Sequence, residues 1–376
     1  MITPGNKKTY MKAVQGKELG DIDAMLTVEE IQIPNLDELP KKKRKKSMII
    51  QTRAVALACG DCRVLSGVTR KFQGPPSFPY IPGGDCSGIV WKIPEEASED
   101  PDYPFQVGDR VAARFMEGPR GALAEYSIID ITVCEKIPEN LSFEEGAILA
   151  SVSPATLLAE RIQEGDRVLV MGGGGGVGSH TCQVMRKQGA SYLVGASSTP
   201  DRLLQEPLKY DKAINYNKQD PFSIQEFKDE PFDVVVDLSG GSWLRLVEDN
   251  NNKDKSIVKP ASQGGRYLTL VSDEAIFEAN SMAQILKPFL FIPLWRFLKS
   301  RLWGRRRLPK YTYAFSIDAE RSHLTRTMNM AEDGTLKVAM DSRGPFSFTT
   351  EGVRKAFRLQ ETRHVHGKVV VQVQKN

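Results

Sequence analysis

A glycine-rich stretch from Gly172 to Gly178 is the feature that most constrains what this chain can fold into, since only Val177 within it is not glycine. An apolar pattern typical of a strand, Arg167 to Met171, precedes it, and a helical pattern from about Val177 to Lys187 follows it. Gly173, Gly175 and Gly178 therefore satisfy the spacing GxGxxG between a strand and a helix. Glycine permits a tight turn with positive φ and lets backbone N–H groups at a helix N-terminus approach a pyrophosphate. The stretch predicts a dinucleotide-binding turn, with a merely flexible glycine loop as the alternative.

The residues after the next expected strand indicate which dinucleotide binds. In an NAD site this strand ends in an acidic residue about 20 residues after the glycines, which accepts hydrogen bonds from the ribose. Ser197 stands at that place. Donors and a positive charge suited to a 2′-phosphate follow it: Ser198, Thr199 and Arg202. The sequence therefore favours NADP(H). The alternative is that Asp201 binds the ribose of NAD, although Thr199-Pro200-Asp201 also has the pattern of a helix start.

The hydrophobic pattern changes near residue 150. Before it, short β-rich segments alternate with turn residues, which predicts a small antiparallel, barrel-like domain. These segments are Met48–Leu57, Gly88–Ile93, Asp109–Ala113 and Ala124–Ile129. From about Pro154, apolar strands alternate with helical stretches, which predicts a parallel sheet flanked by helices. Its strands are expected at Arg167–Met171, Tyr192–Val194, Asp233–Leu238 and Arg266–Val271. The last run, Lys368–Val373, is expected to pair back onto the N-terminal part. We thus predict an α/β fold with units at residues 1–150, 151–316 and 317–376.

The charge of the chain is unevenly distributed. Its 51 basic and 47 acidic residues give a net charge of +4. Six basic residues form the run Lys41 to Lys46, and eight lie between Ser281 and Ile317, where no acidic residue occurs; elsewhere 37 basic residues face 47 acidic ones. The first run is expected to be an extended, solvated loop rather than a nucleic-acid site, because aromatic residues are not interleaved with it. Asn250 to Lys255 is expected to be another exposed loop.

The second basic segment, residues 283–307, combines its charges with large apolar side chains such as Phe291, Trp295 and Trp303. It is interrupted by proline and charged residues, so it falls short of the roughly 20 apolar residues that a membrane span needs. Two interpretations remain open. The segment packs in the core or a dimer interface, or it contacts a membrane surface or a lipophilic substrate.

The five cysteines and the N-terminus bear on location. An odd number of cysteines in a long chain without a signal-peptide pattern favours a reducing compartment, so we expect a cytoplasmic location, with an organelle as the alternative. Cys59 and Cys62 form a CxxC pair, with Cys86 as a possible neighbour. We interpret these as reduced, half-buried residues, since no second CxxC or histidine accompanies them; a metal site or redox pair is the alternative.

Several sequence pieces, in order and spacing, carry a resemblance to a known family. They are CGDCRVLSG at 59–67, PGGDCSGIV at 82–90, GDRV at 108–111, GALAEY at 121–126, EGDRVLV at 164–170, GGVG at 175–178, AINY at 213–216, FDVVVD at 232–237, GG at 264–265 and GK at 367–368. The chain resembles the medium-chain dehydrogenase/reductase superfamily, and within it the zinc-free quinone oxidoreductase-like branch. The resemblance implies a GroES-like β-rich catalytic domain plus a Rossmann domain with a doubly wound parallel sheet, and a homodimer.

The resemblance also bears on zinc. Family members with catalytic zinc carry a cysteine three residues before the aspartate matching Asp61 and a histidine before the acid matching Asp85. This chain has Ala58 and Gly84 at those positions. Catalytic zinc needs about three protein ligands. We therefore expect no metal.

By resemblance, we expect a zinc-independent oxidoreductase that transfers hydride from NADPH to a quinone or an α,β-unsaturated carbonyl, including lipophilic ones. The alternatives are an enoyl-thioester reductase and a non-catalytic nucleotide-binding scaffold. The expected cofactor-binding residues are Thr156, Gly173, Gly175, Gly176, Val177, Gly178, Ser197, Ser198, Arg202, Tyr216, Ser239, Val271 and Ser272. The catalytic candidates are Asp61 and Arg63. Arginine stays protonated and cannot act as a general acid, and Asp61 is more consistent with a structural role, so water is the expected proton source.

Overall fold

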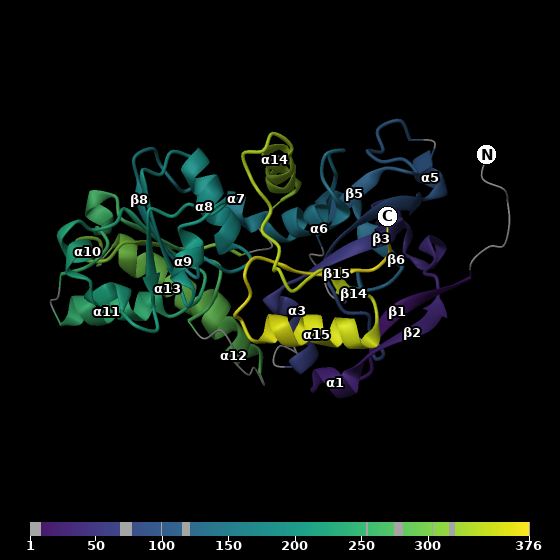
Figure 1. Cartoon of the computed structure of the whole chain (residues 1–376), viewed down its shortest axis with the longest axis horizontal. Coiled ribbons are helices and arrows are strands. Elements are labelled where there is room, and N and C mark those ends of the chain that lie inside the picture. The colour runs from purple at the N-terminus through teal and green to yellow at the C-terminus, as the bar shows by residue number, and fades with distance from the viewer. Residues whose placement is uncertain are drawn as a thin grey trace.

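The computed structural model describes residues 9–67, 77–98, 100–114, 121–252, 255–273, 281–302, 304–315 and 320–375. Two large sheets organise these residues. In Figure 1 the antiparallel sheet lies on the right, the parallel sheet lies on the left, and α14 lies above the junction between them. The first and last described strands, β1 (Tyr10–Gly16) and β15 (Val369–Gln372), both lie in the right half, so the chain crosses to the left half and returns.

The antiparallel part contains a seven-stranded sheet, in which the short pair β14–β15 is parallel, and a separate hairpin. The sheet consists of β3 (Ser47–Leu57), β4 (Asp85–Lys92), β5 (Arg110–Ala113), β6 (Tyr126–Asp130), β7 (Cys134–Lys136), β14 (Phe346–Ser347) and β15 (Val369–Gln372), and the hairpin of β1 (Tyr10–Gly16) and β2 (Leu26–Gln32). The long strand β3 pairs with β4 along one edge. Its other edge pairs with β6 over its first half and with β15 over its second half. The expected return of the C-terminal run onto the N-terminal part is thus confirmed.

The parallel sheet has six strands in the order β10-β9-β8-β11-β12-β13, and every neighbouring pair is parallel. Its strands are β8 (Arg167–Met171), β9 (Tyr192–Ser197), β10 (Lys212–Asn215), β11 (Val234–Asp237), β12 (Arg266–Thr269) and β13 (Lys310–Tyr313). This is the strand order of dinucleotide-binding sheets, in which ligands bind at the carboxyl ends of the strands where the order reverses. Here the reversal lies between β8 and β11.

Helices connect the strands. In the first part they are α1 (Ile22–Met25), η1 (Leu36–Glu38), α2 (Lys41–Arg44), α3 (Cys59–Ser66), α5 (Glu95–Ser98) and η2 (Ile131–Val133). In the middle they are α6 (Phe143–Val152), α7 (Pro154–Ala159), α8 (Gly178–Lys187), α9 (Pro200–Leu203), η3 (Pro221–Ser223), α10 (Gln225–Asp229), α11 (Ser242–Asn251) and η4 (Ala261–Gln263). The last are α12 (Met282–Leu286), the π-helical turn η5 (Lys287–Phe291), α13 (Ile292–Arg301), α14 (Arg321–Glu332) and α15 (Thr350–Glu361).

Alternating apolar side chains place helices on both faces of the parallel sheet. Val168 and Val170 face a core that includes residues of α7, α8 and α14, whereas Leu169 faces a second core with α10 and α11. A strand exposes successive side chains to opposite faces, so a continuous apolar run such as that of β8 requires burial on both sides. The predicted doubly wound α/β architecture is therefore confirmed.

The first of these cores joins the two sheets. It contains Ala54 and Ala56 of β3 and Val370 of β15 together with Val168 and Val170 of β8, and α6 supplies several of its residues. Apolar area shared by both sheets favours a fixed relation between them, because separating them would expose that area to water.

Two expectations about exposed loops need correction. Lys41 to Arg44 form the short helix α2, not an extended loop; the Ser47 hydroxyl donates to the Lys43 carbonyl at 2.9 Å, and Arg44 pairs with Glu96 at 2.5 Å. The side chains of the basic run are nonetheless mostly exposed. Likewise Asn250 and Asn251 form the end of α11, which Asn252 caps, whereas residues 253–254 of the expected loop lie outside the described residues.

Leu149 on α6 tests the shared core, because its side chain is completely buried there. We expect Leu149→Ala to lower the free energy of unfolding by roughly 2–5 kcal/mol through lost burial and a residual cavity. Denaturant unfolding measures this change. Leu204→Ala, at a side chain that is 50% exposed, is the control and should stay within about 0.5 kcal/mol of the native chain. Equal effects at both positions would contradict the assignment of Leu149 to the core.

Candidate functional site

The glycine-rich turn lies at the carboxyl end of β8, beside the reversal of strand order. Gly172 has a φ of 84°, in the region that favours glycine. The N–H groups of Gly172 and Gly173 both donate to the carbonyl of Ala196 at 3.1 Å, which fastens the turn to β9. A Cβ on Gly178 would overlap the carbonyl oxygen of Gly172, so only glycine lets α8 begin this close to β8.

The start of α8 presents backbone donors. Among the described residues, none accepts a hydrogen bond from the N–H groups of Gly176 and Val177. A Cβ on Gly175 would meet only the Gly172 carbonyl, at 3.5 Å, so this side of the turn has room for an approaching group. Free N–H groups and the positive end of a helix dipole form an anion-binding arrangement. Gly173, Gly175, Gly176, Val177 and Gly178 are thus brought together as expected.

Two buried side chains that sequence reasoning missed hold this turn. The hydroxyl of Tyr210 lies 3.2 Å from the carbonyl oxygen of Gly178, and a Cβ on Gly173 would come within 2.9 Å of that hydroxyl. His180 bonds through Nδ1 to the carbonyl of Gly176 at 2.8 Å, and its Nε2 accepts from the N–H of Ala339 at 3.0 Å. Because Nε2 accepts, Nδ1 must carry the proton, so both bonds require neutral imidazole. Burial lowers the pKa of His180 to about 4.

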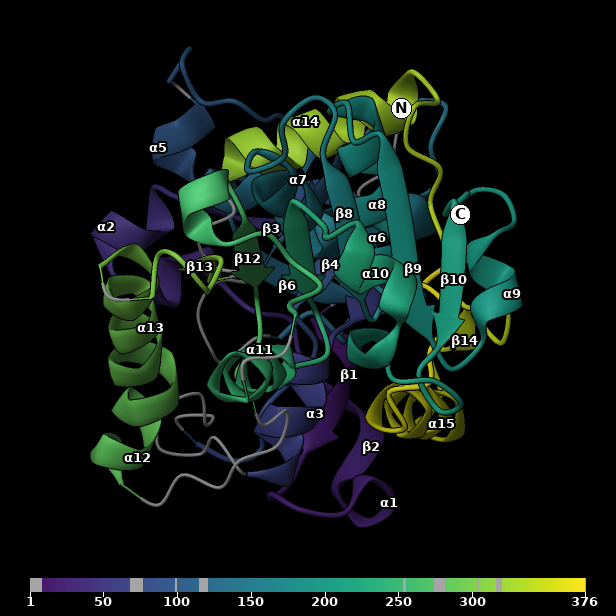
Figure 2. The ribbon, with the colours of Figure 1, turned by 90° about the vertical axis from the view of Figure 1, so that its left-hand side faces the viewer.

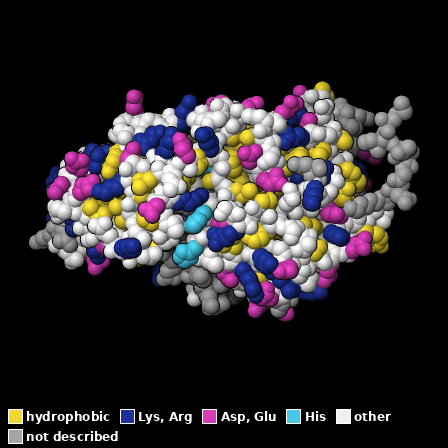
Figure 3. All heavy atoms as spheres, in the orientation of Figure 1, with side chains coloured by type: hydrophobic (Ala, Val, Ile, Leu, Met, Phe, Trp, Pro, Cys, Tyr) yellow, Lys and Arg dark blue, Asp and Glu magenta, His cyan; other side chains and the backbone are white. Residues whose placement is uncertain are grey.

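The C-terminal return closes over the same turn. The carbonyl of Gly174 accepts three hydrogen bonds: from Arg202 at 3.1 Å, from the hydroxyl of Ser179 at 3.1 Å and from the N–H of Gly367 at 3.2 Å. The stem of Lys368 packs against Gly176, and its ammonium group donates to the carbonyl of Leu57 at 2.6 Å. Four parts of the chain that are far apart in sequence therefore meet at one place, near residues 60, 175, 200 and 367. In Figure 3, histidine side chains lie beside basic ones near the middle of the face shown.

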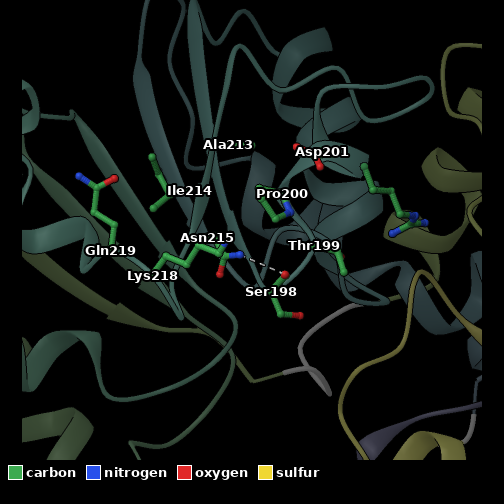
Figure 4. A pocket seen from close by; sticks show the side chains of 10 residues that line it. Ser198, Thr199, Pro200, Asp201, Ala213, Ile214, Asn215, Lys218 and Gln219 are labelled. Carbon is green, nitrogen blue, oxygen red and sulfur yellow. Dashed lines mark hydrogen bonds between the residues drawn. The ribbon is translucent and has the colours of Figure 1, made fainter.

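A pocket of about 690 Å³ adjoins the turn between β9, α9 and the end of β10. Figure 4 shows its lining side chains, among which the amide of Asn215 donates to the carbonyl of Ser198 at 3.5 Å. The lining residues are Ser198, Thr199, Pro200, Asp201, Arg202, Ala213, Ile214, Asn215, Lys218 and Gln219. Arg202 and Lys218 give the pocket two positive charges. Lys218 was not expected as a site residue, although its position two residues after the AINY piece was a possible signal.

The end of β9 approaches the C-terminal return. Ser197 is the last residue of β9, and its hydroxyl accepts from the N–H of Thr199 at 3.1 Å. The Thr199 hydroxyl does not cap α9; it lies 3.3 Å from Nε2 of His366. Burial and the nearby charge of Arg202 lower the pKa of the His366 imidazole, and the backbone N–H of His366 donates to the Asp341 carboxylate at 2.8 Å. Burial tends to raise the pKa of Asp341, but hydrogen bonds from Arg343 and His366 lower it to about 2.

The turns after β11 and β12 meet on the other side of the strand reversal. Asp237 is completely buried and accepts from the N–H groups of Ser239 and Gly240 at 3.0 and 2.8 Å, and from the Tyr267 hydroxyl at 2.6 Å. A Cβ on Gly240 would overlap the carbonyl of Ser272, so these two turns touch. The expected residues Ser239, Val271 and Ser272 thus lie at neighbouring strand ends, and Asp237, which was missed, shapes the first turn.

The remaining expected residues, Thr156 and Tyr216, are not among those that line the pocket. Thr156 is completely buried in α7, and its hydroxyl donates to the carbonyl of Ser153 at 2.7 Å and lies 3.3 Å from that of His323. Tyr216 is 43% exposed and does not line the pocket.

The two catalytic candidates lie on α3. The Asp61 carboxylate is buried and accepts from the N–H of Ala58 at 2.7 Å, so it caps the helix. Arg63 lies near enough to Tyr313, at the end of β13, for its charge to act on that hydroxyl. Burial raises the pKa of Tyr313, and the charge of Arg63 opposes the rise.

Possible metal ligands are sparse here. Within the described part of the chain, no group of three or more His, Cys, Asp or Glu side chains could hold a metal ion. All five cysteines are free, and the amide of Gln360 donates to the Cys59 sulfur at 3.4 Å.

Comparison with known proteins identifies the family. An alcohol dehydrogenase GroES-like domain matches residues 44–139, and a zinc-binding dehydrogenase domain matches residues 208–371. A chloroplastic NADPH-dependent alkenal/one oxidoreductase of Arabidopsis thaliana is 27% identical over 367 residues, with 96% of this chain and 79% of the relative covered. The quinone oxidoreductase of Mus musculus is 26% identical over 270 residues, which cover 69% of this chain and 73% of that relative. The chain belongs to the medium-chain dehydrogenase/reductase superfamily, in its quinone oxidoreductase-like branch.

Solved structures of the superfamily share the fold. The quinone oxidoreductase of Coxiella burnetii superposes with a TM-score of 0.67 at 21% identity, over 97% of this chain and all of that one. The quinone oxidoreductase of Pseudomonas syringae superposes with a TM-score of 0.69 at 20% identity, over 96% of this chain and 99% of that one. The GroES-like and Rossmann parts expected from the resemblance are therefore confirmed.

His180 makes the stability of the glycine turn dependent on pH. The unfolded chain takes up this proton near pH 6.5, whereas the folded chain resists it until about pH 4. Between these values the unfolded state binds more protons, so the free energy of unfolding falls as the pH is lowered, by about 3 kcal/mol for this group. We expect His180→Gln, which keeps a donor and an acceptor, to remove this part of the slope in denaturant unfolding from pH 7 to pH 4.

The matched control is His364→Gln, at an exposed histidine, which should keep the native slope. An unchanged slope in His180→Gln would contradict the neutral, doubly bonded imidazole.

Proposed function

We propose that this protein is an oxidoreductase that uses NADPH to reduce a quinone or an enone. The observation that carries the proposal is the pocket after β9, where Arg202 and Lys218 stand and Ser197 takes the place of the ribose-binding acid of NAD sites. Two positive charges suit a 2′-phosphate, which NADP carries and NAD lacks. The names of the relatives, among them an alkenal/one oxidoreductase and quinone oxidoreductases, support the substrate class.

The residues of the chain fit a dinucleotide along the carboxyl edge of the parallel sheet. In this proposal the N–H groups of Gly176 and Val177, from which no described residue accepts a hydrogen bond, bind the pyrophosphate, and Gly175 leaves room for it. Arg202, held by the Gly174 carbonyl, and Lys218 bind the 2′-phosphate. Asp201 is exposed in the first turn of α9, where it also lines the pocket. Ser239, Val271 and Ser272 then lie towards the nicotinamide half.

Bound NADPH supplies a hydride, which a conjugated carbonyl compound accepts at its electrophilic carbon. The chain contributes position and an environment poor in water. Arg63 lies on α3, and its charge acts on the Tyr313 hydroxyl at the end of β13; we propose that its guanidinium orients the carbonyl oxygen of the acceptor. The proton that completes the reduction comes from water in this scheme, because Asp61 is committed to capping α3.

We further propose that the reaction needs no zinc. The support is chemical: Ala58 and Gly84, at the positions where zinc-dependent members carry cysteine and histidine, have no side-chain atom that could coordinate zinc. A metal assay on purified protein, read beside its turnover, tests this: turnover that depends on stoichiometric zinc would refute it.

The proposal extends to features that remain predictions. We propose a homodimer and a cytoplasmic location, with units at residues 1–150, 151–316 and 317–376. Light scattering measures whether the protein is a homodimer. Imaging of the tagged full chain shows whether it is located in the cytoplasm.

Titration of the protein with NADPH and NADH, followed by turnover of a panel of quinones, enones and enoyl thioesters, tests the function. We expect tighter binding of NADPH and turnover of quinones or enones. Failure to bind NADPH would reject the proposal. Binding of NADPH without turnover would favour a nucleotide-binding scaffold. Faster turnover of enoyl thioesters than of quinones and enones would favour an enoyl-thioester reductase.

Lys218 and Arg202 test the selectivity of the pocket. We expect Lys218→Ala and Arg202→Ala each to weaken NADPH binding by about ten- to a hundredfold, as loss of a charge-assisted hydrogen bond does, with little effect on NADH. Lys187→Ala, at an exposed lysine in the last turn of α8, is the matched control and should change neither affinity. Equal weakening of NADPH and NADH would show that the charges do not recognise a 2′-phosphate.

A further inference from the structure

The basic segment after residue 281 forms a helical column along one side of the molecule. Figure 2 shows α12 and α13 one after the other beside β13, the edge strand of the parallel sheet. Large apolar side chains of this column are exposed to solvent: Phe291 is 57% exposed, Leu294 50% and Leu302 60%. With Leu290 and Leu298 they recur at helical spacing from the end of η5, through α13, to the residue that caps it, and we call these five residues the outer face of α13.

The opposite side of α13 is firmly attached to the fold. Arg296 is buried and forms a two-pronged ion pair with Asp273, with N–O distances of 2.8 and 2.6 Å. The hydroxyl of Ser300 accepts from the N–H of Tyr311 at 3.0 Å. The inner residues Pro293, Arg296 and Ser300 thus follow helical spacing too. The outer face is therefore the stable solvent side of a docked helix, because its inner side already has polar and packing partners.

Positive charge borders the outer face at both ends. Lys287 is exposed before it, and Arg305, Arg306 and Arg307 are exposed after it. Residues 281–317 contain no acidic side chain. By contrast, basic and acidic side chains are interspersed over the face of the molecule in Figure 3. Apolar side chains between cations match the interface of an anionic bilayer, where hydrocarbon lies beneath negative headgroups.

We infer that the outer face of α13 docks the protein onto an anionic membrane surface. The helix lies in the plane of the interface: Phe291, Leu294 and Leu298 enter the acyl boundary, and the arginines after α13 contact the headgroups. None of the described helices is long and apolar enough to cross a membrane. The inference is independent of the proposed reaction.

A second copy of this chain fits the surface less well. In a two-fold contact the same patch meets itself, so the cations at the ends of the outer face would oppose cations of the other copy. Among the described residues, the side chains of Lys287 and Arg305 to Arg307 form no ion pair that could offset this repulsion. An anionic lipid surface supplies the missing charge.

Co-sedimentation of the full chain with vesicles tests the inference. At low salt we expect binding to vesicles of equimolar phosphatidylcholine and phosphatidylserine, little binding to pure phosphatidylcholine, and weakening as salt rises. We expect Phe291→Ser with Leu294→Ser to reduce binding by about tenfold or more. Arg305→Gln with Arg306→Gln should reduce it by about fivefold for each charge removed.

The chain offers matched controls for both changes. Leu244→Ser replaces an exposed leucine on α11, and Lys42→Gln with Lys45→Gln removes two charges from the other basic segment. These variants should bind vesicles like the native chain. Unchanged unfolding midpoints and unchanged NADPH affinity in the outer-face variants would show that the fold and the coenzyme pocket are intact.

Three results would overturn the inference. The first is no vesicle binding by the native chain at low salt. The second is equal loss of binding in the test and control variants. The third is dissociation of a native dimer by the Phe291 and Leu294 changes without loss of vesicle binding, which would make the outer face a subunit contact.

Discussion

The close packing of α8 against β8 is the contact on which the proposed coenzyme site depends. A side chain at Gly178 would overlap the Gly172 carbonyl, and the left-handed φ of Gly172 suits glycine. With both positions occupied by glycine, the first N–H groups of α8 lie at the carboxyl edge of the sheet. The anion-binding property of the turn follows from that placement, since a helix N-terminus acts only over its first turn.

Partners from distant parts of the chain then stabilise the turn. Tyr210 and Ala196 belong to the parallel sheet and its connections, whereas Gly367 and Lys368 arrive with β15, which pairs with β3 of the antiparallel sheet. His180 links the Gly176 carbonyl to Ala339 and needs to be neutral to do so. The turn is thus built where the two sheets share a core, and movement of one sheet against the other would disturb it.

The distribution of charge also follows from the fold. The acidic body of the chain and its two basic segments almost cancel in the net charge of +4. One basic segment forms a short exposed helix, and the other buries Arg296 against Asp273 while the outer face of α13 remains in solvent. The ion pair fixes which side of α13 faces outward.

Sequence by itself determined the elements whose signal is local. The glycine spacing, the apolar runs of β8 and β11 and the serine at the end of β9 predicted the parallel sheet, the turn and the preference for a phosphorylated dinucleotide. The side chains that surround the turn were decided only by the tertiary structure. His180 and His366 carry no local pattern, and Lys218 and Asp237 lie beside or within recognisable sequence pieces that do not reveal their roles. These roles arise from hydrogen bonds and charges that meet after strands far apart in the chain have paired. Helical periodicity could likewise reveal two faces of α13, but only the docking of Arg296 on Asp273 decided which of them meets the solvent.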